Sequence, residues 1–458
     1  MLIGRVGHWW QALGGPPQRR PALAGPLEAD VAIVGAGFTG LWTALYLARA
    51  DPALRICVLE AEFAGFGASG RNGGWVMGSF SGPARAYAAR SGAGAVAALH
   101  REMFATVKEI ERIVGELGID AGLQRTGQLT VAIGAAQAAR LEGHLADQRA
   151  LGIGGDDLAL LDAKALSRRV RIAGALGASF SPHVARVQPA RLVAGLARAA
   201  EQHGVAIYED TPVEALEPGL ARTRHGDVRA RWVVRATEGY TASLAGERRT
   251  LVPMNSSMIA TEPLGDDVWD AIGWDGRELI GDDANVYIYM QRTEDDRIAI
   301  GGRGVPYRFG SRTDGDGDTA RSTIEALGAK LAAMFPALAP VPVEHAWSGV
   351  LGVPRDWCIS VQADRATGIA SAGGYVGEGV AASNLAGRTL TDLVLERDSA
   401  LTRLPWVGRR ARRWEPEPLR WAMIRAVYGL YRRADAAEAA SGRPSRVAAF
   451  VDRASGRV

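Results

Sequence analysis

The chain has 458 residues, 47% of them hydrophobic, and a formal net charge of +3. This length is enough for two domains with sizeable cores, and the small net charge excludes a general affinity for nucleic acid. The only two cysteines, Cys57 and Cys358, exclude a secreted disulfide framework and favour a reducing, cytoplasmic compartment.

Residues 1–28 form an N-terminal extension without a sustained apolar core, so they do not resemble a signal peptide. No window further along the chain approaches the ~18 unbroken apolar residues that a transmembrane span needs. The seven histidines are scattered, and no cluster has the spacing of metal ligands. The sequence therefore predicts a protein without a transmembrane segment and without a metal site.

Residues 30–60 follow a strand, glycine turn, helix, strand and acid pattern. Gly35, Gly37 and Gly40 give the spacing G-x-G-x-x-G directly after an apolar strand. The first glycine makes the tight turn, the second lets a pyrophosphate approach the backbone, and the third lets the helix pack on the strand. The helix N-terminus favours phosphates, and Glu60 ends the second strand, where it can accept from ribose hydroxyls. The pattern predicts a bound dinucleotide, with an unliganded strand–helix turn as the alternative.

Six of the ten residues from 65 to 74 are glycine or alanine. Each glycine costs backbone entropy, so this composition suits a loop that presses its backbone against a ligand better than a packed element. Arg71 supplies a cation, and Asn72 supplies a hydrogen-bond donor and an acceptor. The loop is therefore expected to contact the dinucleotide, with a flexible surface loop as the alternative.

The rest of the chain alternates helical and extended patterns. Helices are expected over residues 92–118, 136–152 and 190–203, and strands over 127–132, 205–208 and 231–237, with a hairpin turn near 226–227. Residues 246–345 have the alternation of an antiparallel sheet, with a polar, glycine-rich loop at 313–319. A strand, glycine loop and helix are expected over 369–397. A helix over 418–440 is expected to pack on the protein body or a partner subunit, with a membrane-surface helix as the other interpretation.

The run from Ala29 to Gly74 resembles the amino-terminal signature of the FAD-dependent amine and amino-acid oxidoreductases, the D-amino-acid oxidase superfamily. Residues 37–44 and 67–74 are similar in particular to the branch of gamma-glutamylputrescine oxidase and the predicted aminophosphonate oxidoreductases. Further similar segments are residues 180–182, 187–189, 260–264, 297–302, 374–380 and 414–421. The resemblance covers nearly the whole chain.

This resemblance implies an α/β protein, α+β overall. An FAD-binding Rossmann-like domain of the glutathione-reductase type is built from discontinuous segments, and an antiparallel-sheet domain binds the substrate. The expected FAD-binding segments are 29–82, 185–245 and 346–400, and the expected substrate-binding segments are 83–184 and 246–345. Residues 401–458 are expected to be a basic helical tail, through which an oligomer can form.

The motif and the glycine loop predict the first group of cofactor-binding residues. These are Gly35, Ala36, Gly37, Phe38, Thr39, Gly40, Glu60, Ala61, Gly67, Ala68, Ser69, Gly70, Arg71, Asn72, Gly73 and Gly74. The resemblance adds Val213 against the adenine, Ala236 and Thr237 beneath the cofactor, and Gly239, Tyr375, Gly377, Gly379 and Val380. The last glycines open a helix where the family stabilises the negative charge of the reduced flavin; an ordinary glycine turn is the alternative.

For substrate contacts we expect Tyr289, Arg303, Trp347 and Tyr375, because aromatic rings can wall a pocket and arginine can hold a carboxylate or phosphonate. The alternative is that Tyr289 and Trp347 are core residues and Arg303 is a surface charge. Glu378 stands where many relatives have His or Asn, so it is expected either to bind a substrate ammonium or to face solvent.

The sequence also differs from its relatives in ways that bear on the cofactor. The related sarcosine oxidases place a lysine beside the flavin to help oxygen react, and residues 287–303 contain none. The electron acceptor is therefore either O₂ or another oxidant. The loop over 65–78 has no histidine, and Cys358 lies beyond the attachment position of those oxidases, so FAD is expected to bind non-covalently.

The resulting expectation is an FAD-dependent enzyme that oxidises the C–N bond of a small primary or secondary amine or amino acid. Hydride transfer to flavin N5 gives an imine, which water hydrolyses. The substrate is expected to be a small molecule, including anionic ones such as an aminophosphonate. The alternatives are an NAD-dependent dehydrogenase, which leaves the loops at 65–74 and 374–380 unexplained, and a flavin-binding subunit without independent turnover.

Overall fold

The glycine motif folds as its sequence predicts. In the computed structural model, which describes residues 1–304, 306–313 and 315–456, β2 (Leu27–Val34) runs into the glycine turn and α2 (Phe38–Ala50) follows. β3 (Ile56–Leu59) then pairs with β2 in parallel. From Val31 to Val34 every residue of β2 is buried, which is typical of a parallel strand with helices on both faces.

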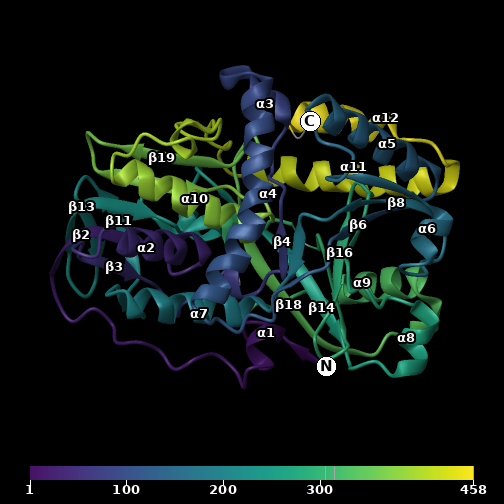
Figure 1. Ribbon diagram of the computed structural model, residues 1–458, viewed down its shortest axis with the longest axis horizontal. Coiled ribbons are helices and arrows are strands. Elements are labelled where there is room, and N and C mark those ends of the chain that lie inside the picture. The colour runs from purple at the N-terminus through teal and green to yellow at the C-terminus, as the bar shows by residue number, and fades with distance from the viewer. Residues whose placement is uncertain (305, 314, 457–458) are drawn as a thin grey trace.

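The eight-stranded sheet around β2 gathers three distant parts of the chain (Figure 1). The parallel strands follow the order β10 (Ala206–Tyr208), β3, β2, β13 (Val228–Arg235) and β20 (Ile369–Gly373). β12 (Leu220–Thr223) pairs antiparallel with the start of β13, β11 (Val213–Glu217) pairs with β12, and β19 (Ser360–Asp364) pairs with β20. α2 packs between α7 (Pro189–Gln202) and α10 (Gly379–Val394), and α4 (Ala93–Glu116) packs on α10.

A nine-stranded sheet forms the other half of the molecule. Its order is β1 (Leu2–Ile3), β18 (Val343–Val353), β14 (Val252–Thr261), β17 (Ile298–Gly302), β16 (Ile288–Arg292), β15 (Leu279–Asp282), β6 (Gln128–Ile133), β8 (Ala175–Ser181) and β7 (Ala159–Asp162). Its pairs are antiparallel except β1 with β18 and β15 with β6. The predicted fold class, a discontinuous Rossmann-like unit with a largely antiparallel second sheet, is confirmed.

The remaining elements connect or cover these sheets. β4 (Trp75–Met77), β9 (Val184–Arg186) and β5 (Gln124–Arg125) form a three-stranded sheet. The other helices are α1 (His8–Gln11), α3 (Ala84–Ser91), α5 (Ala135–Ala150), α6 (Ala163–Ser167), α8 (Asp266–Ile272) and α9 (Arg321–Met334). Short 3-10 helices are η1 (Ala68–Gly70), η2 (Glu238–Ser243), η3 (Phe309–Ser311), η4 (Pro336–Leu338) and η5 (Leu401–Arg403).

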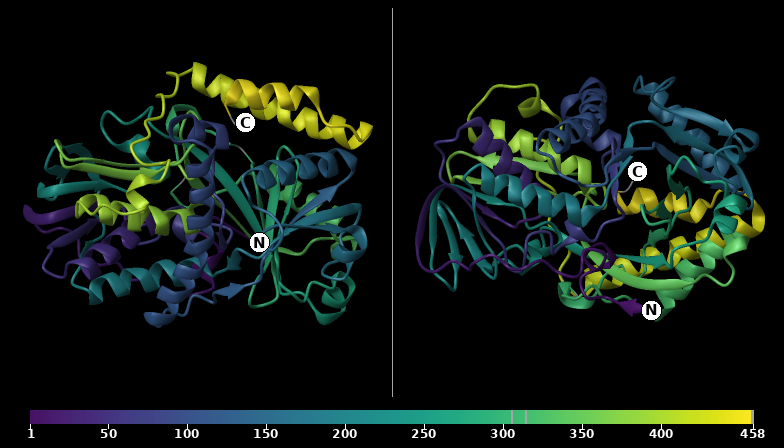
Figure 2. Two further views of the ribbon diagram at one scale, coloured as in Figure 1. Left: turned by 45° about the horizontal axis from the view of Figure 1, so that its top comes forward. Right: turned by 60° about the horizontal axis from the view of Figure 1, so that its bottom comes forward.

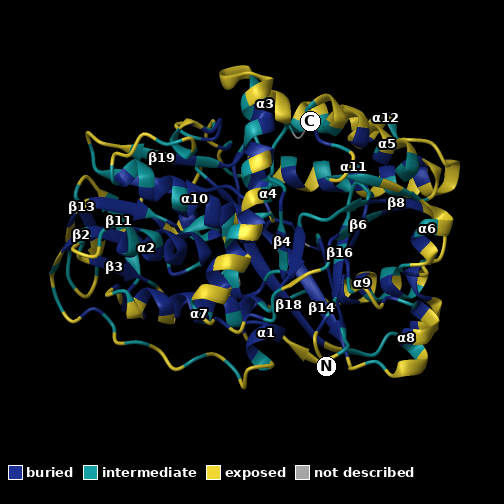
Figure 3. Cartoon of the chain, viewed as in Figure 1, coloured by how far each residue is buried: buried dark blue, intermediate teal, exposed yellow. Residues whose placement is uncertain are grey.

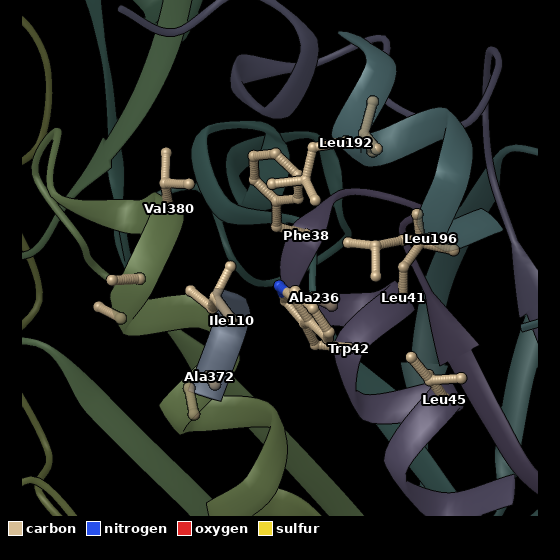
Figure 4. Close-up of a cluster of buried hydrophobic side chains, with 14 of the residues drawn as sticks. Phe38, Leu41, Trp42, Leu45, Ile110, Leu192, Leu196, Ala236, Ala372 and Val380 are labelled. Atoms are coloured by element: carbon tan, nitrogen blue, oxygen red, sulfur yellow. The ribbon is translucent and has the colours of Figure 1, made fainter. Parts of the chain in front are cut away.

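The main core lies between the first sheet and its helices, where buried residues are dense (Figure 3). Leu41 and Leu45 of α2 face Leu192 and Leu196 of α7, and Trp42 lies on the side of α2 toward Ile110 (Figure 4). Burying each such leucine contributes ~1.5–3 kcal/mol. The glycine turn at the start of α2 is therefore held in place by a well-packed helix.

The structure also differs from the expected organisation in two places. The turn at residues 226–227 joins β12 to β13, but β11 and β12 form a second hairpin before it that the sequence did not predict. The boundary expected at residue 346 falls inside β18, which pairs with β14 along the nine-stranded sheet.

The N-terminal extension is attached to both halves of the molecule. β1 adds an edge strand to the nine-stranded sheet, and Trp9 and Trp10 of α1 are buried. Further along, Arg20 forms ion pairs with Glu209 at 2.9 Å and with Glu201 at 2.7 Å. The extension therefore crosses from one sheet to the other as an ordered strap.

The tail folds into α11 (Leu419–Ser441) and α12 (Arg446–Ser455), which lie together over the half with the nine-stranded sheet (Figure 2). Ile424, Tyr428 and Tyr431 are buried, so α11 packs on the protein body, one of the two packings expected for this helix. Among the described residues, none of the helices combines the length and the apolar character needed to cross a bilayer.

Candidate functional site

A cavity of about 450 Å³ opens at the carboxyl ends of parallel strands β2, β3 and β13. Val34, Leu59 and Ala236, which end or follow these strands, form part of its wall. The carboxyl edge of a parallel sheet is where open α/β folds bind ligands, because the strand–helix turns converge there. The cavity therefore lies where the glycine motif predicts a dinucleotide.

The glycine turn is shaped by two close approaches. Gly35 has φ of +105°, a conformation that glycine adopts without strain. A Cβ atom on Gly40 would lie 1.9 Å from the carbonyl oxygen of Gly35, so only glycine lets α2 pack this close to β2. Gly37 lines the cavity, and the amide of Phe38 at the start of α2 donates to Ser69 Oγ at 2.8 Å.

Glu60 occupies the position expected for the ribose-binding acid. It follows β3 and lines the cavity, where its carboxylate accepts from the amides of Ala36 at 2.7 Å and Glu62 at 3.0 Å. Burial raises the pKa of Glu60 to about 7, although these two amides oppose the shift. The carboxylate retains acceptor sites, which suits the hydroxyl donors of a ribose.

The glycine-rich loop lies beside the motif but uses its arginine differently from our expectation. Gly67, Ala68, Ser69 and Asn72 line the cavity. Arg71 instead donates from Nε to the carbonyl of Phe66 and from Nη2 to that of Gly315, both at 2.7 Å. It thus ties the loop to a distant segment, and it borders a second cavity rather than the first.

Most of the predicted cofactor residues line the first cavity: Gly35, Gly37, Phe38, Thr39, Glu60, Ala61, Gly67, Ala68, Ser69, Asn72, Val213, Ala236, Thr237, Gly239, Tyr375, Gly377, Gly379 and Val380. Ala36, Gly40, Gly70, Arg71, Gly73 and Gly74 do not. Gly70 and Gly74 approach Trp10 and Gln291 too closely for a Cβ atom, so their glycines serve packing.

Glu238 is a cavity residue that the sequence analysis did not single out. It follows β13, and its carboxylate accepts from the amides of Gly374 at 2.9 Å and Tyr375 at 3.1 Å, which fixes the last glycine loop against the first sheet. Burial raises its pKa to about 7. Its position three residues after the end of a parallel strand, near the edge where Glu60 also lies, was the signal that could have found it.

A second cavity of about 440 Å³ adjoins the first and shares Ala68, Asn72, Leu351, Gly377 and Val380 with it. Three of the expected substrate residues line it: Tyr289, Arg303 and Glu378. Residues that the sequence did not indicate include Ser256, Asp283, Arg140 and Asp452. A ligand in the second cavity would therefore meet the end of a ligand in the first.

Tyr289 is held in one orientation in this second cavity. Its hydroxyl is 2.8 Å from Ser256 Oγ, and burial raises its pKa. Cβ atoms on Gly73 and Gly301 would lie 2.7 Å and 2.3 Å from its ring, so both glycines make room for it. Close by, Arg303 donates from Nη2 to the carbonyl of Val376 at 3.0 Å.

Two expected substrate residues lie elsewhere. Trp347 is fully buried, donates from Nε1 to the carbonyl of Arg71 at 2.9 Å and stacks on His8, so it supports the glycine loop from behind. Tyr375 lines the first cavity, with its hydroxyl 3.0 Å from Thr39 Oγ1. Neither ring lines the second cavity, so their contact with a substrate stays a prediction.

The tail reaches the second cavity through one residue of α12 and contacts the segments around it. Asp452 of α12 is among its lining residues. Asp435 of α11 accepts from the amides of Asn285 at 2.9 Å and Val286 at 3.0 Å, and Glu438 pairs with Arg140 at 3.0 Å. The tail thus orders the segment that leads into β16 and Tyr289.

The groups around the first cavity fit a dinucleotide such as FAD. The turn and the start of α2 offer backbone amides to a pyrophosphate, Glu60 offers an acceptor to a ribose, and the start of α10 faces the far end. Gly379, Val380 and Ser383 of α10 line this end, where helix amides favour a negative charge.

The raised pKa of Glu60 predicts a pH-dependent effect on stability. Between its ordinary value of 4.5 and about 7, the folded apoprotein holds a proton that the unfolded chain has released, so this group's contribution to stability falls as the pH rises through 7. Glu60→Gln removes the effect. We expect the free energy of unfolding of Glu60→Gln, relative to wild type, to increase from pH 5 to pH 8 in urea titrations of apoprotein.

The difference in free energy of unfolding between Glu60→Gln and wild type is free of the contributions that other titrating groups make equally to both proteins. Buried His8 and His100, whose pKa burial lowers to about 4, change stability in the opposite direction, but equally in both proteins. A difference between Glu60→Gln and wild type that stays constant from pH 5 to pH 8 would contradict the raised pKa.

Comparisons with known proteins agree with this geometry. The family model described as FAD dependent oxidoreductase (DAO) matches residues 30–393. Gamma-glutamylputrescine oxidoreductase of Escherichia coli (strain K12) is 33% identical over 396 residues, covering 83% of this chain and 87% of that protein. The probable oxidoreductase OrdL of Haemophilus influenzae is 28% identical over 397 residues, covering 83% and 86%.

Solved structures share the fold. Glycine oxidase from Geobacillus kaustophilus superposes with a TM-score of 0.69 at 22% identity, covering 84% of this chain and 100% of that one. L-Proline dehydrogenase from P. horikoshii superposes with a TM-score of 0.67 at 18% identity, covering 83% of this chain and 98% of that one. The resemblance predicted from the sequence is confirmed, and it selects FAD over a nicotinamide cofactor. The chain belongs to the DAO family of FAD-dependent oxidoreductases.

Proposed function

We propose that this enzyme oxidises the C–N bond of a small primary or secondary amine or amino acid to an imine, which water then hydrolyses. When bound, FAD supplies a two-electron acceptor whose N5 takes a hydride from the carbon next to nitrogen. The observation that carries the proposal is the second cavity, which shares five lining residues with the cofactor cavity. The names of the relatives, a gamma-glutamylputrescine oxidoreductase, a glycine oxidase and an L-proline dehydrogenase, favour nitrogen compounds as substrates.

The proposal includes an anionic group on the substrate, such as a carboxylate or phosphonate. Arg303 lines the second cavity beside Gly377, and its Nη1 has no hydrogen-bond partner among the described residues. A guanidinium pairs well with a planar carboxylate or a phosphonate. Glu378, on the same cavity, offers the opposite charge to a substrate ammonium.

Two further parts of the proposal concern the cofactor and the tail. We propose that FAD binds non-covalently, and that either O₂ or another oxidant reoxidises it, since residues 287–303 lack a lysine. The tail stays our proposed contact for an oligomer, because Val447 and Phe450 of α12 are 48% and 68% exposed.

The test is a panel of amines, amino acids and aminophosphonates mixed with the yellow holoenzyme under nitrogen. We expect at least one of them to bleach the flavin absorbance near 450 nm, and the ammonia or amine released after hydrolysis to match the FAD reduced. Hydroxy acids of the same length serve as controls. Bleaching by hydroxy acids alone would contradict the amine assignment, and bleaching by no compound would favour a flavin-binding subunit without turnover.

A further inference from the structure

We propose that Glu378 is the general base that takes a proton from the bound substrate ammonium and so delivers the free amine for oxidation. This inference rests on the proposed function and names a residue for a step that the function requires. An ammonium has no lone pair on nitrogen, whereas a free amine can donate its lone pair as the hydride leaves the neighbouring carbon. Some group has to accept the proton, because alkyl amines with a pKa of about 10 arrive protonated near pH 7.

The position of Glu378 places its carboxylate where the two cavities meet. It lies between Gly377 and Gly379, and Gly377 lines both cavities. Glu378 itself lines the second cavity but not the first. A substrate nitrogen that reaches the cofactor end of the second cavity would therefore pass this carboxylate.

The side chain of Glu378 is turned away from its own helix. Glu378 is the N-cap residue of α10, and a carboxylate at this position usually accepts from the helix amides. Here it makes no such bond. It accepts instead from Ser79 Oγ at 3.0 Å, so most of its acceptor sites remain for a ligand. The amides at the start of α10 are correspondingly left to the cofactor cavity.

Burial and the Ser79 hydroxyl are the influences on the pKa of Glu378; burial is the larger and raises this pKa to about 7. The charged and titratable groups that line the same cavity come from several elements: Arg71 of the glycine loop, Arg303 after β17, Tyr287 and Tyr289 at β16, Asp282 and Asp283 at the end of β15, Arg140 and His144 of α5, and Asp452 of α12. A base with a pKa near the working pH accepts a proton readily and also releases it.

The other groups are poor candidates for this base. Tyr289 shares a hydrogen bond with Ser256, and burial raises its pKa. Asp282 is paired with Lys330 at 2.8 Å, and Asp452 accepts from the hydroxyl of Tyr431 at 2.6 Å. Asp283 faces Arg140 and His144. Glu378 differs from these carboxylates in two ways. It is next to Gly377, which lines both cavities, and its hydrogen-bond partner is the neutral hydroxyl of Ser79.

The proposed step balances as a simple proton transfer. One N–H bond of R–CH₂–NH₃⁺ breaks and its electron pair stays on nitrogen, while an O–H bond forms on a carboxylate oxygen of Glu378. The products are R–CH₂–NH₂ and neutral Glu378. The two electrons removed later from the substrate go to FAD, which this family already uses, and the proton held by Glu378 leaves to solvent before the next turnover.

The experiment compares wild type, Glu378→Gln and a matched control, Glu325→Gln, which makes the same change at an exposed carboxylate of α9 that lines neither cavity. Anaerobic flavin reduction by a primary amine is followed in single turnovers from pH 6 to pH 10. We expect Glu378→Gln to be slower by ~10²- to 10⁴-fold at pH 7. The loss should shrink to about tenfold or less at pH 10, because free amine is then abundant without a base. Glu325→Gln should keep the wild-type rate and pH profile.

A second readout does not depend on turnover. An amine that carries no hydrogen on the carbon next to nitrogen, such as tert-butylamine, binds without being oxidised, and its binding is followed by the shift in flavin absorbance. For wild type we expect affinity to weaken as the pH falls below 7 and Glu378 becomes protonated. For Glu378→Gln we expect weak affinity that does not change in this range.

The outcomes separate the two proposals. If amines reduce wild type but Glu378→Gln has the same pH profile, or loses equal activity at pH 7 and pH 10, the role of Glu378 as base is overturned and the amine oxidation stands. If amines reduce none of the proteins, the proposed function fails and this inference fails with it. FAD content and thermal unfolding of each variant check that the fold and cofactor site are intact.

Discussion

Gly40→Ala is expected to prevent formation of a stable holoenzyme. A Cβ atom at this position would lie 1.9 Å from the carbonyl oxygen of Gly35 and 3.2 Å from Ile33, so the backbone itself has to move. The neighbouring Leu41 and Trp42 are fully buried and resist a shift of α2. Overpacking of this kind costs ~1–3 kcal/mol or more, and it opens the turn that the dinucleotide needs. Urea unfolding of apoprotein and FAD uptake measured at 450 nm check this result.

Gly37→Ala is the matched control for this prediction. Its Cβ atom would lie 2.9 Å from Ser69 Oγ, a side-chain atom that can rotate away, and it would project into the cofactor cavity. We expect this variant to fold with apoprotein stability within about 1 kcal/mol of wild type but to bind FAD more weakly. If Gly40→Ala proved as stable as Gly37→Ala, the packing role assigned to Gly40 would be wrong.

Trp347→Ala is expected to destabilise the protein by ~3–5 kcal/mol, the usual cost of deleting a buried large aromatic side chain. Trp347 is fully buried, stacks on His8 with ring centroids 5.7 Å apart, and donates to the carbonyl of Arg71. Its loss leaves a cavity beneath the glycine loop, so FAD retention should fall as well. The denaturant midpoint and the fraction of FAD that survives gel filtration measure the two effects.

Trp347→Phe separates this supporting role from a substrate contact. The ring fills most of the space but loses the N–H donor, so we expect a smaller loss of stability of ~1–3 kcal/mol. Because Trp347 lies outside the second cavity, the concentration of amine that gives half-maximal flavin reduction should change by less than about threefold. A large change in that concentration, with stability unaffected, would restore the original interpretation of Trp347 as a pocket wall.

The glycine motif could be predicted from the sequence because its constraints are local. Gly35, Gly37, Gly40 and Glu60 are fixed by the geometry of one strand–turn–helix–strand unit, whose residues are close along the chain. The helices over residues 92–118, 136–152 and 190–203 were also predicted, since their apolar spacing reports which face is buried. The β11–β12 hairpin, which the sequence did not predict, turns at Pro218-Gly219, a dipeptide typical of turns.

Tertiary structure decided which side chains face the second cavity. By sequence, Tyr289 and Trp347 were equivalent aromatic candidates. Gly73 and Gly301 make room for the ring of Tyr289 beside the cavity. Trp347 is instead enclosed by His8 and Arg71. The sequence also did not predict that Asp452 of α12 lines the second cavity. This residue is far along the chain from the strands that form the rest of the cavity wall. The sequence by itself determined the dinucleotide-binding unit, since its glycine spacing rests on short-range backbone geometry, and its resemblance to the D-amino-acid oxidase superfamily implied FAD and the fold class. The substrate cavity was decided by contacts between residues hundreds of positions apart, and no local pattern encodes the direction in which such side chains point.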